Sequence, residues 1–168
     1  DVFTDLSLVM DTSWRTGLVG RNGQAIYFNG GNYINVNKNK GWSSLTEGVS
    51  VDFWVKKLSG NGAIRLFNMD GGLEVYLSGG SSVNAAITDG SNNRITINGG
   101  SISTNNWSHI AFTFDPTSKE MTLYVNGDQV ATRLANGFGT LRTSGSVHIG
   151  PESSSGLLLL DEVKVSNV

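Results

Sequence analysis

The fold is decided by residues 107–130, which read WSHIAFTFDPTSKEMTLYVNGDQV. Apolar and polar residues alternate in two runs, and a polar turn separates these runs. Alternation with a period of two lets a β-strand bury one face and turn the other toward solvent. Asn126-Gly127 ends the second run with a pair that tolerates the positive backbone dihedrals of a tight hairpin turn. The stretch therefore predicts antiparallel β-structure.

Similar short runs recur along the chain, and turns rich in Gly, Asn, Asp and Ser separate nearly all of them. We expect strands at residues 25–28, 33–36, 49–55, 63–69, 73–77, 83–88, 94–97, 107–114, 121–125, 146–149 and 157–165. Leu6, Leu8 and Met10 also alternate, and we expect them to form an edge strand beside the C-terminal Val163 and Val165. This spacing predicts an all-β fold, an antiparallel sandwich of two sheets.

Composition supports a single domain over residues 1–168. The chain has 22 Gly, 2 Pro and 15% charged residues, which is the profile of short strands joined by many turns. A hydrophobic content of 38%, together with repeated alternation, argues against disorder. A chain of this size buries about 70% of its unfolded surface, so it needs neither disulfides nor a second domain for stability.

Five segments together resemble one known family. In chain order they are FNGGNYI at 28–34, VSVDFWVK at 49–56, the stretch at 107–130, VHIG at 147–150 and LDEVKV at 160–165. They resemble the laminin-G-like domains, which are concanavalin-A-like jelly rolls, and the resemblance covers residues 26–165. One departure is that Leu157 to Leu160 stand where the family usually has an aromatic residue and a Gly before Asp-Glu-Val. The resemblance implies a jelly-roll sandwich.

Charge and hydropathy argue against several classes of partner. The net charge is −2 and the 12 basic residues are scattered singly, so the basic stripe of a nucleic-acid site is missing. No apolar run approaches the ~18 residues of a membrane-spanning helix, and we expect no membrane insertion. The absence of Cys suits an extracellular, cell-surface or virion location and equally the cytoplasm. Because the chain begins at Asp1, we expect a processed product or an excised domain.

Jelly rolls also include polysaccharide hydrolases and lyases, but their catalytic patterns are missing here. A retaining glycosidase needs two carboxylates about 5 to 5.5 Å apart, and neighbouring Asp161 and Glu162 would point to opposite faces of a regular strand. His109 and His148 lie on separate predicted strands, and we interpret His109 as a hydrogen-bonded strand residue. With no Cys and two separated His, a zinc site is also disfavoured. We expect no enzyme activity.

Calcium is the metal that the resemblance implies, because many such domains hold a structural calcium at one edge of the sandwich. Calcium takes about 6 to 8 oxygen ligands and tolerates irregular loops. Asp161 is the first candidate: in phase with Val163 and Val165 we expect it to face inward, where a carboxylate needs a cation or several backbone donors. Asp11 and Asn32, in polar turns, are further candidates. The alternative is that Asp161 caps backbone amides at a bulge.

Sugar-binding sandwiches use exposed aromatic rings that stack on the sugar, and amides that bond its hydroxyl groups. Trp14, Trp42 and Phe138 are the candidate ligand-binding residues, because each lies among polar or Gly residues rather than in an alternating strand. A large ring in a loop can instead plug one end of the core. Trp54 and Trp107 lie in predicted strands, where we expect core or sheet-face packing.

These observations predict a non-catalytic binding or adhesion module, with a glycan or a surface protein as partner, from a larger secreted, surface or virion protein. Carbohydrate recognition is the first hypothesis. One alternative is a structural domain of a phage or viral fibre or adhesin, which should trimerise or bury an apolar face. A second is a polysaccharide lyase or hydrolase. The sequence predicts neither the identity of the ligand nor the oligomeric state.

Overall fold

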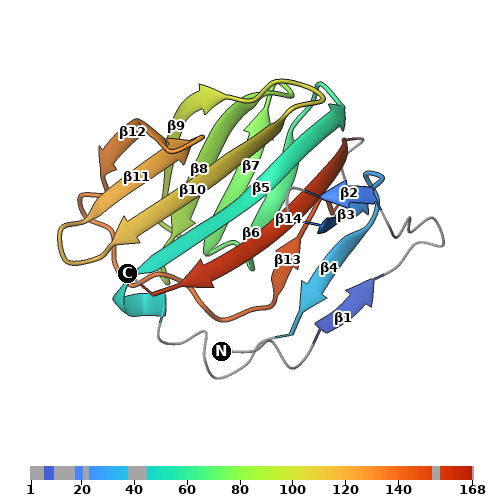
Figure 1. Ribbon diagram of the computed structural model, residues 1–168. Helices are drawn as coiled ribbons and strands as arrows, with labels where there is room; N and C mark the ends of the chain where they lie inside the picture. Colours follow the sequence, from blue (N-terminus) through green and yellow to red (C-terminus); the bar gives the residue numbers. More distant parts are fainter. Residues whose placement is uncertain (1–5, 10–17, 21–22, 38–44, 153–155, 168) are drawn as a thin grey trace.

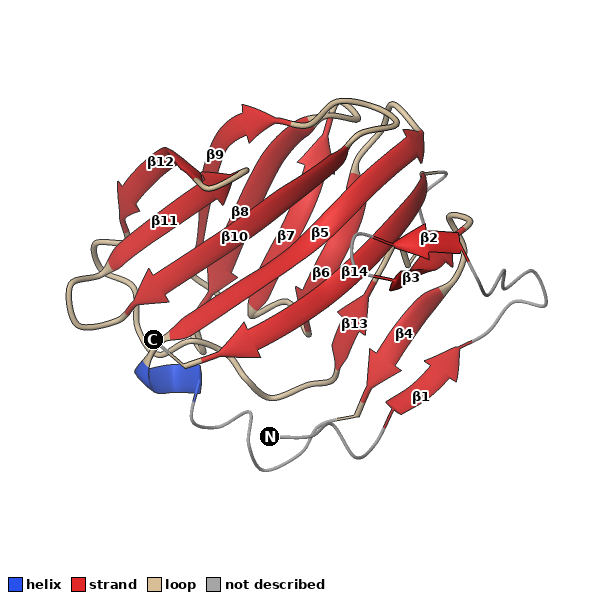
Figure 2. Ribbon diagram, viewed as in Figure 1, coloured by secondary structure: helices blue, strands red, loops and turns tan. Residues whose placement is uncertain are grey.

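β-Strands make up nearly all of the regular structure (Figure 2). The computed structural model describes residues 6–9, 18–20, 23–37, 45–152 and 156–167. Within these ranges the strands are β1 Leu6–Val9, β2 Leu18–Gly20, β3 Gly23–Phe28, β4 Tyr33–Val36, β5 Val49–Ser59, β6 Ile64–Met69, β7 Leu73–Ser78, β8 Ser82–Thr88, β9 Arg94–Ser101, β10 Trp107–Asp115, β11 Glu120–Val125, β12 Asp128–Leu134, β13 Val147–Ile149 and β14 Leu157–Ser166. A single turn of 3₁₀ helix covers residues 45–47.

The described strands form two antiparallel seven-stranded sheets. Sheet I has the order β1-β4-β13-β6-β7-β8-β9, and sheet II has the order β12-β11-β10-β5-β14-β3-β2. Figure 1 shows them as two layers, with β5, β10 and β14 lying in front of β6, β7 and β8. The predicted fold class, an all-β antiparallel sandwich, is confirmed.

The core lies between the inner faces of the two sheets. Along β5, buried and half-buried residues alternate, so that Val51, Phe53 and Val55 are buried while Trp54 faces outward. The largest fully buried side chains come from both sheets: Phe28, Phe53, Phe67, Phe112, Phe114, Ile64, Leu66, Met69, Leu73, Leu77, Ile87 and Ile110. Each side chain of this size contributes roughly 1.5–3 kcal/mol by its removal from water. The alternation that predicted the strands is therefore also the source of stability.

The stretch at 107–130 folds as predicted. β10 pairs with β11 from Ile110 opposite Val125 to Asp115 opposite Glu120. Asn126 and Gly127 have φ angles of 55° and 88°, and they turn the chain into β12. The sequence did not predict β12, because an edge strand that is mostly exposed carries no apolar alternation.

The N-terminal edge strand exists, but its predicted partner is wrong. Leu6 lies opposite Val36 and Leu8 opposite Ile34, so β1 pairs with β4 at the edge of sheet I. β14 lies in sheet II, where β3 and β5 occupy both of its sides. Because both sides of β14 are paired, it has no free backbone edge for β1. β4 pairs with β13 on one side, and β1 pairs with its other side. Met10 lies outside the described residues.

Candidate functional site

β14 carries a bulge at the position predicted to bind calcium. Asp161 lies opposite Trp54 of β5, but Lys164 lies opposite Asp52, so β14 holds one more residue than β5 across this interval. Glu162, inside the interval, has a φ of 51°, which places its backbone in the left-handed region. An extra residue of this kind locally interrupts the ladder and shifts the alternation of side chains.

The pairing register does not match the prediction that Asp161 faces inward, although Asp161 borders an apolar cavity between the sheets. Residues directly opposite one another in an antiparallel pair share a face of the sheet, so Asp161 shares the outer face with Trp54. Val165 lies opposite the buried Val51 and packs against the core, as Val163 does. Sequence phase would place all three β14 residues on one face, and the extra residue breaks that phase.

The predicted calcium ligands are engaged by backbone amides. Asp161 Oδ1 accepts a hydrogen bond from the Glu162 N–H at 2.9 Å, and Asn32 Oδ1 accepts one from the Asn29 N–H at 2.8 Å. The first contact matches the bulge-capping alternative. Asp11 lies outside the described residues, and among those described no group of three or more His, Cys, Asp or Glu could hold a metal ion. These observations do not test a site built from backbone carbonyls and single carboxylates, so calcium stays a prediction.

Of the three predicted ligand-stacking rings, Trp14 and Trp42 lie outside the described residues. Phe138 is 3% exposed, and its ring packs edge-on against Phe114 with centroids 5.2 Å apart and an interplanar angle of 78°. The expectation of an exposed platform at Phe138 is wrong. Gly137, with a φ of 76°, turns the loop so that the ring plugs the core, which was the stated alternative.

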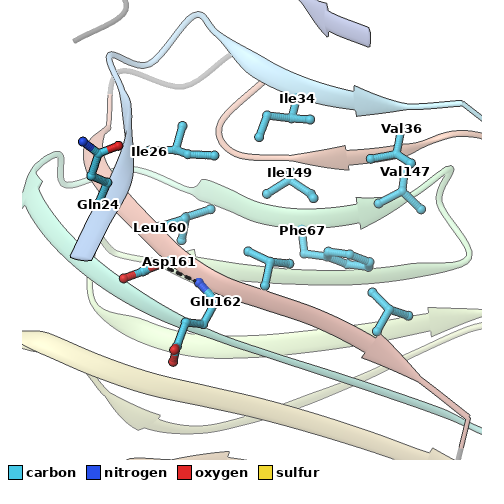
Figure 3. Close-up of a pocket in the computed structure, with 12 residues that line it drawn as sticks. Gln24, Ile26, Ile34, Val36, Phe67, Val147, Ile149, Leu160, Asp161 and Glu162 are labelled. Carbon is cyan, nitrogen blue, oxygen red and sulfur yellow. Dashed lines mark hydrogen bonds between the residues drawn. The ribbon is translucent and has the colours of Figure 1, made fainter. Parts of the chain in front are cut away.

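A cavity of about 300 Å³ lies between the sheets beside the bulge (Figure 3). Its walls come from β3 and β14 of sheet II and from β4, β6 and β13 of sheet I. The lining residues are Gln24, Ile26, Ile34, Val36, Phe67, Val147, Ile149, Leu160, Asp161, Glu162, Val163 and Val165. Because nine of these twelve are aliphatic or aromatic, the cavity does not suit a hydroxyl-rich ligand.

The outer face of sheet I differs from this apolar cavity, because mostly polar residues lie opposite one another on its neighbouring strands. The pairing register places the following residues opposite one another across β4, β13, β6, β7, β8 and β9: Asn35, His148, Asn68, Glu74, Ala86 and Thr96. A second row runs across β6, β7, β8 and β9 through Arg65, Tyr76, Asn84 and Asn98. Paired residues on one face have Cβ atoms about 4.5–5.5 Å apart, so these side chains can interact.

Ion pairs join the two rows. Glu74 on β7 accepts contacts from Arg65 Nη2 at 3.5 Å and from Arg94 Nη2 at 2.8 Å. Arg65 Nη1 also contacts Glu152 Oε2 at 2.5 Å, in the loop after β13. The order of charges across the face is Arg94, Glu74, Arg65 and Glu152. Each carboxylate is thereby paired with at least one guanidinium.

Glu152 joins this chain of charges to His148. Asn68 Nδ2 donates to Glu152 Oε1 at 3.3 Å, and His148 Nδ1 contacts the same oxygen. Burial raises the pKa of the Glu152 carboxyl, but the hydrogen bonds from Asn68 and His148 and the Arg65 charge outweigh burial, so this pKa lies below its ordinary value. The His148 ring also packs against Tyr33, with centroids 4.8 Å apart. We call Arg65, Arg94, Glu74, Glu152, His148 and Asn68 the polar network.

The polar network combines shielded carboxylates with accessible guanidiniums. The side chains of Glu74 and Glu152 are 13% and 18% exposed, although they lie on the outer face. Those of Arg65 and Arg94 are 37% and 40% exposed. A ligand that approaches this face therefore meets polar groups already held in place by their neighbours.

Sequence reasoning missed these residues, although one signal was present. In β7, Glu74 and Tyr76 alternate with Leu73, Val75 and Leu77, which marks the outward positions. The contacts of Glu74 depend on the register between β6 and β7, and those of Glu152 depend on how the loop after β13 lies against β6. A single sequence does not predict either.

The outer face of sheet II carries a smaller group centred on His109. His109 Nε2 lies 3.3 Å from Asp52 Oδ1, and the His109 and Trp54 rings are 5.2 Å apart with an interplanar angle of 57°. These contacts confirm the interpretation of His109 as a hydrogen-bonded strand residue and the sheet-face packing expected for Trp54. Trp107 is half-buried and lies opposite Lys56.

The comparison with protein families matches most of the chain. Residues 28–168 match a laminin G model described as the concanavalin A-like lectin/glucanases superfamily. The chain belongs to this superfamily. The resemblance inferred from the five segments is thereby confirmed, and the superfamily accounts for the jelly-roll sandwich. No curated protein sequence matches the chain.

Solved structures of toxin binding domains share the fold of this superfamily member. The binding domain of Paraclostridial mosquitocidal protein 1 is 20% identical, with a TM-score of 0.78 over 96% of this chain and 44% of that one. The receptor-binding domain of botulinum neurotoxin C/D mosaic serotype is 16% identical, with a TM-score of 0.79 over 98% and 43%. The binding domain of botulinum neurotoxin DC in complex with SialylT is 12% identical, with a TM-score of 0.76 over 98% and 43%.

This chain thus spans less than half the length of those structures. At these identities the likeness concerns the fold. In the described part of the chain, no helix has the length and apolar character needed to cross a membrane.

Proposed function

We propose that this superfamily member is a non-catalytic carbohydrate-binding module of a larger protein, and that the outer face of sheet I holds the glycan. The observation that carries the proposal is the polar network, which places guanidinium donors and carboxylate acceptors side by side on a sheet. The apolar cavity beside β14 and the His109–Asp52 pair on sheet II do not combine guanidiniums with carboxylates in this way.

The chemistry of the polar network suits sugar hydroxyl groups. A hydroxyl group both donates and accepts, so neighbouring hydroxyls can accept from Arg65 or Arg94 and donate to Glu74. Charge-assisted hydrogen bonds of this kind are roughly twice as strong as neutral ones. Tyr76 and Asn98, in the adjacent row, add a ring and an amide at the edge of the same surface.

The pKa of the Glu152 carboxyl supports a binding role over a hydrolytic one. A general acid needs a raised pKa so that it holds a proton near neutral pH. The pKa of the Glu152 carboxyl is lowered instead, after its hydrogen bonds and the Arg65 charge outweigh burial. Glu74 lies between two guanidiniums, with which it forms ion pairs, whereas a hydrolytic base needs contact with a water molecule. The lyase or hydrolase alternative would be supported by turnover on a panel of polysaccharides.

The similar structures are binding domains, one of them in complex with SialylT. This likeness supports a glycan or a surface receptor as the class of partner and an extracellular, surface or virion location. The fibre alternative requires an apolar face for trimerisation. In the described residues the exposed large apolar side chain is Leu134, at 55% exposure, on edge strand β12. One such side chain gives that alternative little support.

A glycan array tests the proposal. The wild-type domain, Arg65→Ala, Arg94→Ala and the sheet II control Lys164→Ala are compared, each shown to be folded by circular dichroism. We expect selective binding by wild type and Lys164→Ala, and a loss of at least about tenfold in both arginine variants. Running each with calcium and with chelator tests the predicted calcium separately. Equal binding by all four proteins would place the glycan elsewhere, and silence of folded wild type would overturn the proposed function.

A further inference from the structure

We propose that the polar network selects uncharged glycans and discriminates against acidic ones, an inference that rests on the proposed function. The network holds two arginines and two glutamates, so its formal charge is zero when His148 is neutral. Arg65 contacts both carboxylates, and Arg94 contacts Glu74. Each of these two guanidiniums therefore already has an anionic partner.

An acidic sugar meets a poorly matched surface here. Its carboxylate or sulfate must displace Glu74 or Glu152 from a guanidinium, or bind beside them as a like charge. Displacement would leave a Glu74 side chain that is 13% exposed without its ion pairs, and a shielded, unpaired charge is costly. A specific acidic-sugar site instead needs a guanidinium that is free to donate hydrogen bonds to the acidic group of the ligand.

An uncharged sugar avoids this conflict, because it can bind without breaking an ion pair. A guanidinium has five N–H donors, and two contacts at Arg65 and one at Arg94 leave further donors on each. A carboxylate accepts about four hydrogen bonds, so Glu74 can also receive a hydroxyl proton in addition to its ion pairs. Adjacent hydroxyl groups on a neutral sugar can use both kinds of group together.

Glu74→Gln is the variant that changes this selectivity. Glutamine has nearly the same size and shape, but it removes the charge that pairs with both arginines. Arg94 would then lose its carboxylate partner within the network and could bind an acidic group. Asp52→Asn on the outer face of sheet II is the matched control, because it removes the same single negative charge from the chain at a distance from the polar network.

The test is an array of paired glycans, each core present unmodified, sialylated and sulfated, read for wild type and both variants. Wild type and Asp52→Asn should bind a neutral core at least tenfold more strongly than its acidic forms. Glu74→Gln should gain at least about tenfold in affinity for an acidic form. That gain should shrink as the NaCl concentration is raised from about 50 to about 500 mM, because salt screens the attraction between charges. Neutral binding by wild type should change less than twofold over the same salt range.

Two results would overturn the inference while leaving carbohydrate binding intact. One is wild-type binding of acidic forms as strong as binding of their neutral cores. The other is an equal gain in Glu74→Gln and Asp52→Asn, which would mean that overall charge and not the polar network sets the preference. Silence of folded wild type on every pair would overturn the proposed function and this inference together. Should Glu74→Gln fail to fold, Glu152→Gln tests the same idea at Arg65 Nη1, which loses its carboxylate partner while Arg94 keeps Glu74; a gain for acidic forms is again expected, and no gain would contradict the inference.

Discussion

The two outer faces of the sandwich arise from the same alternation, but they differ in how their polar groups are held. On sheet I, Arg65, Arg94, Glu74 and Glu152 form a continuous set of ion pairs, and the carboxylates are 13% and 18% exposed. On sheet II, Asp52 and His109 form one contact, and each side chain is 27% exposed. The comparison shows that an outward position does not by itself make a solvated one.

Shielding changes what each polar group does. A partly buried charge costs desolvation energy, which its partners must offset with good geometry. An exposed pair, by contrast, typically contributes about 0–1 kcal/mol and is screened by salt. We therefore expect sheet I to be both more sensitive to substitution and better organised in advance for a ligand.

The largest expected effect tests whether Phe138, at the end of the sandwich, belongs to the core or to a ligand-binding surface separate from the two outer faces. Phe138→Ala should destabilise the fold by about 3–5 kcal/mol, because it removes a buried ring that packs on Phe114. Leu134→Ala, at an exposed position, should cost less than about 0.5 kcal/mol. Urea denaturation measures both. A small loss for Phe138→Ala together with a loss of glycan binding would restore Phe138 as a ligand platform.

The next effect tests the difference between the two faces directly. Glu74→Ala should cost about 1–3 kcal/mol, because it removes the shielded acceptor of two charge-assisted contacts. Asp52→Ala on sheet II should cost less than about 1 kcal/mol. The same denaturation experiment compares them. Equal losses would mean that shielding does not distinguish the faces.

A smaller effect concerns pH. Since the pKa of the Glu152 carboxyl is lowered by folding from an ordinary value of 4.5, its contribution to stability is present above about pH 4.5. This contribution is lost as pH falls through the folded-state pKa. Glu152→Gln should thus be less stable than wild type at pH 7, and the gap should narrow at acid pH. A gap that stays constant across thermal melts from pH 7 to 3 would contradict this account.

The smallest effect is expected at the β14 bulge. Asp161→Asn keeps an oxygen that can accept the Glu162 N–H, so the melting temperature should change by no more than about 2 °C. Added calcium should then shift wild type and variant by the same small amount. A calcium-dependent rise of about 5 °C or more in wild type, absent from Asp161→Asn, would establish the predicted metal site.

Local pattern predicted much of the fold. Alternation in residues 107–130 identified β10 and β11, because a strand with one buried face has apolar and polar residues in alternation. β12 was not predicted, because an exposed edge strand lacks the apolar face that produces an alternating pattern. The orientation of Asp161 was also missed, because one extra residue in β14 reverses the phase, and a short sequence does not reveal such a bulge.

The candidate site was harder to predict, because its residues lie on different strands and come together only through the pairing register of those strands. Glu74 and Tyr76 stood at outward positions of a predicted strand, but their neighbours Arg65 and Arg94 come from two other strands. Glu152 lies in a loop far along the chain. Aromatic residues in polar loops were chosen instead, and Phe138 shows why that rule failed: a ring in a loop can fold back into the core.

An NMR titration of the ¹⁵N-labelled domain with the neutral glycan best bound on the array tests the central claim most directly. If the outer face of sheet I is the binding site, saturable shifts should centre on the amides of β6, β7 and β9 and on the loop holding Glu152. Amides of β5 and β10 around Asp52 and His109 should stay near their starting positions. Saturable shifts centred on β5 and β10, with β6 and β7 unchanged, would contradict the account.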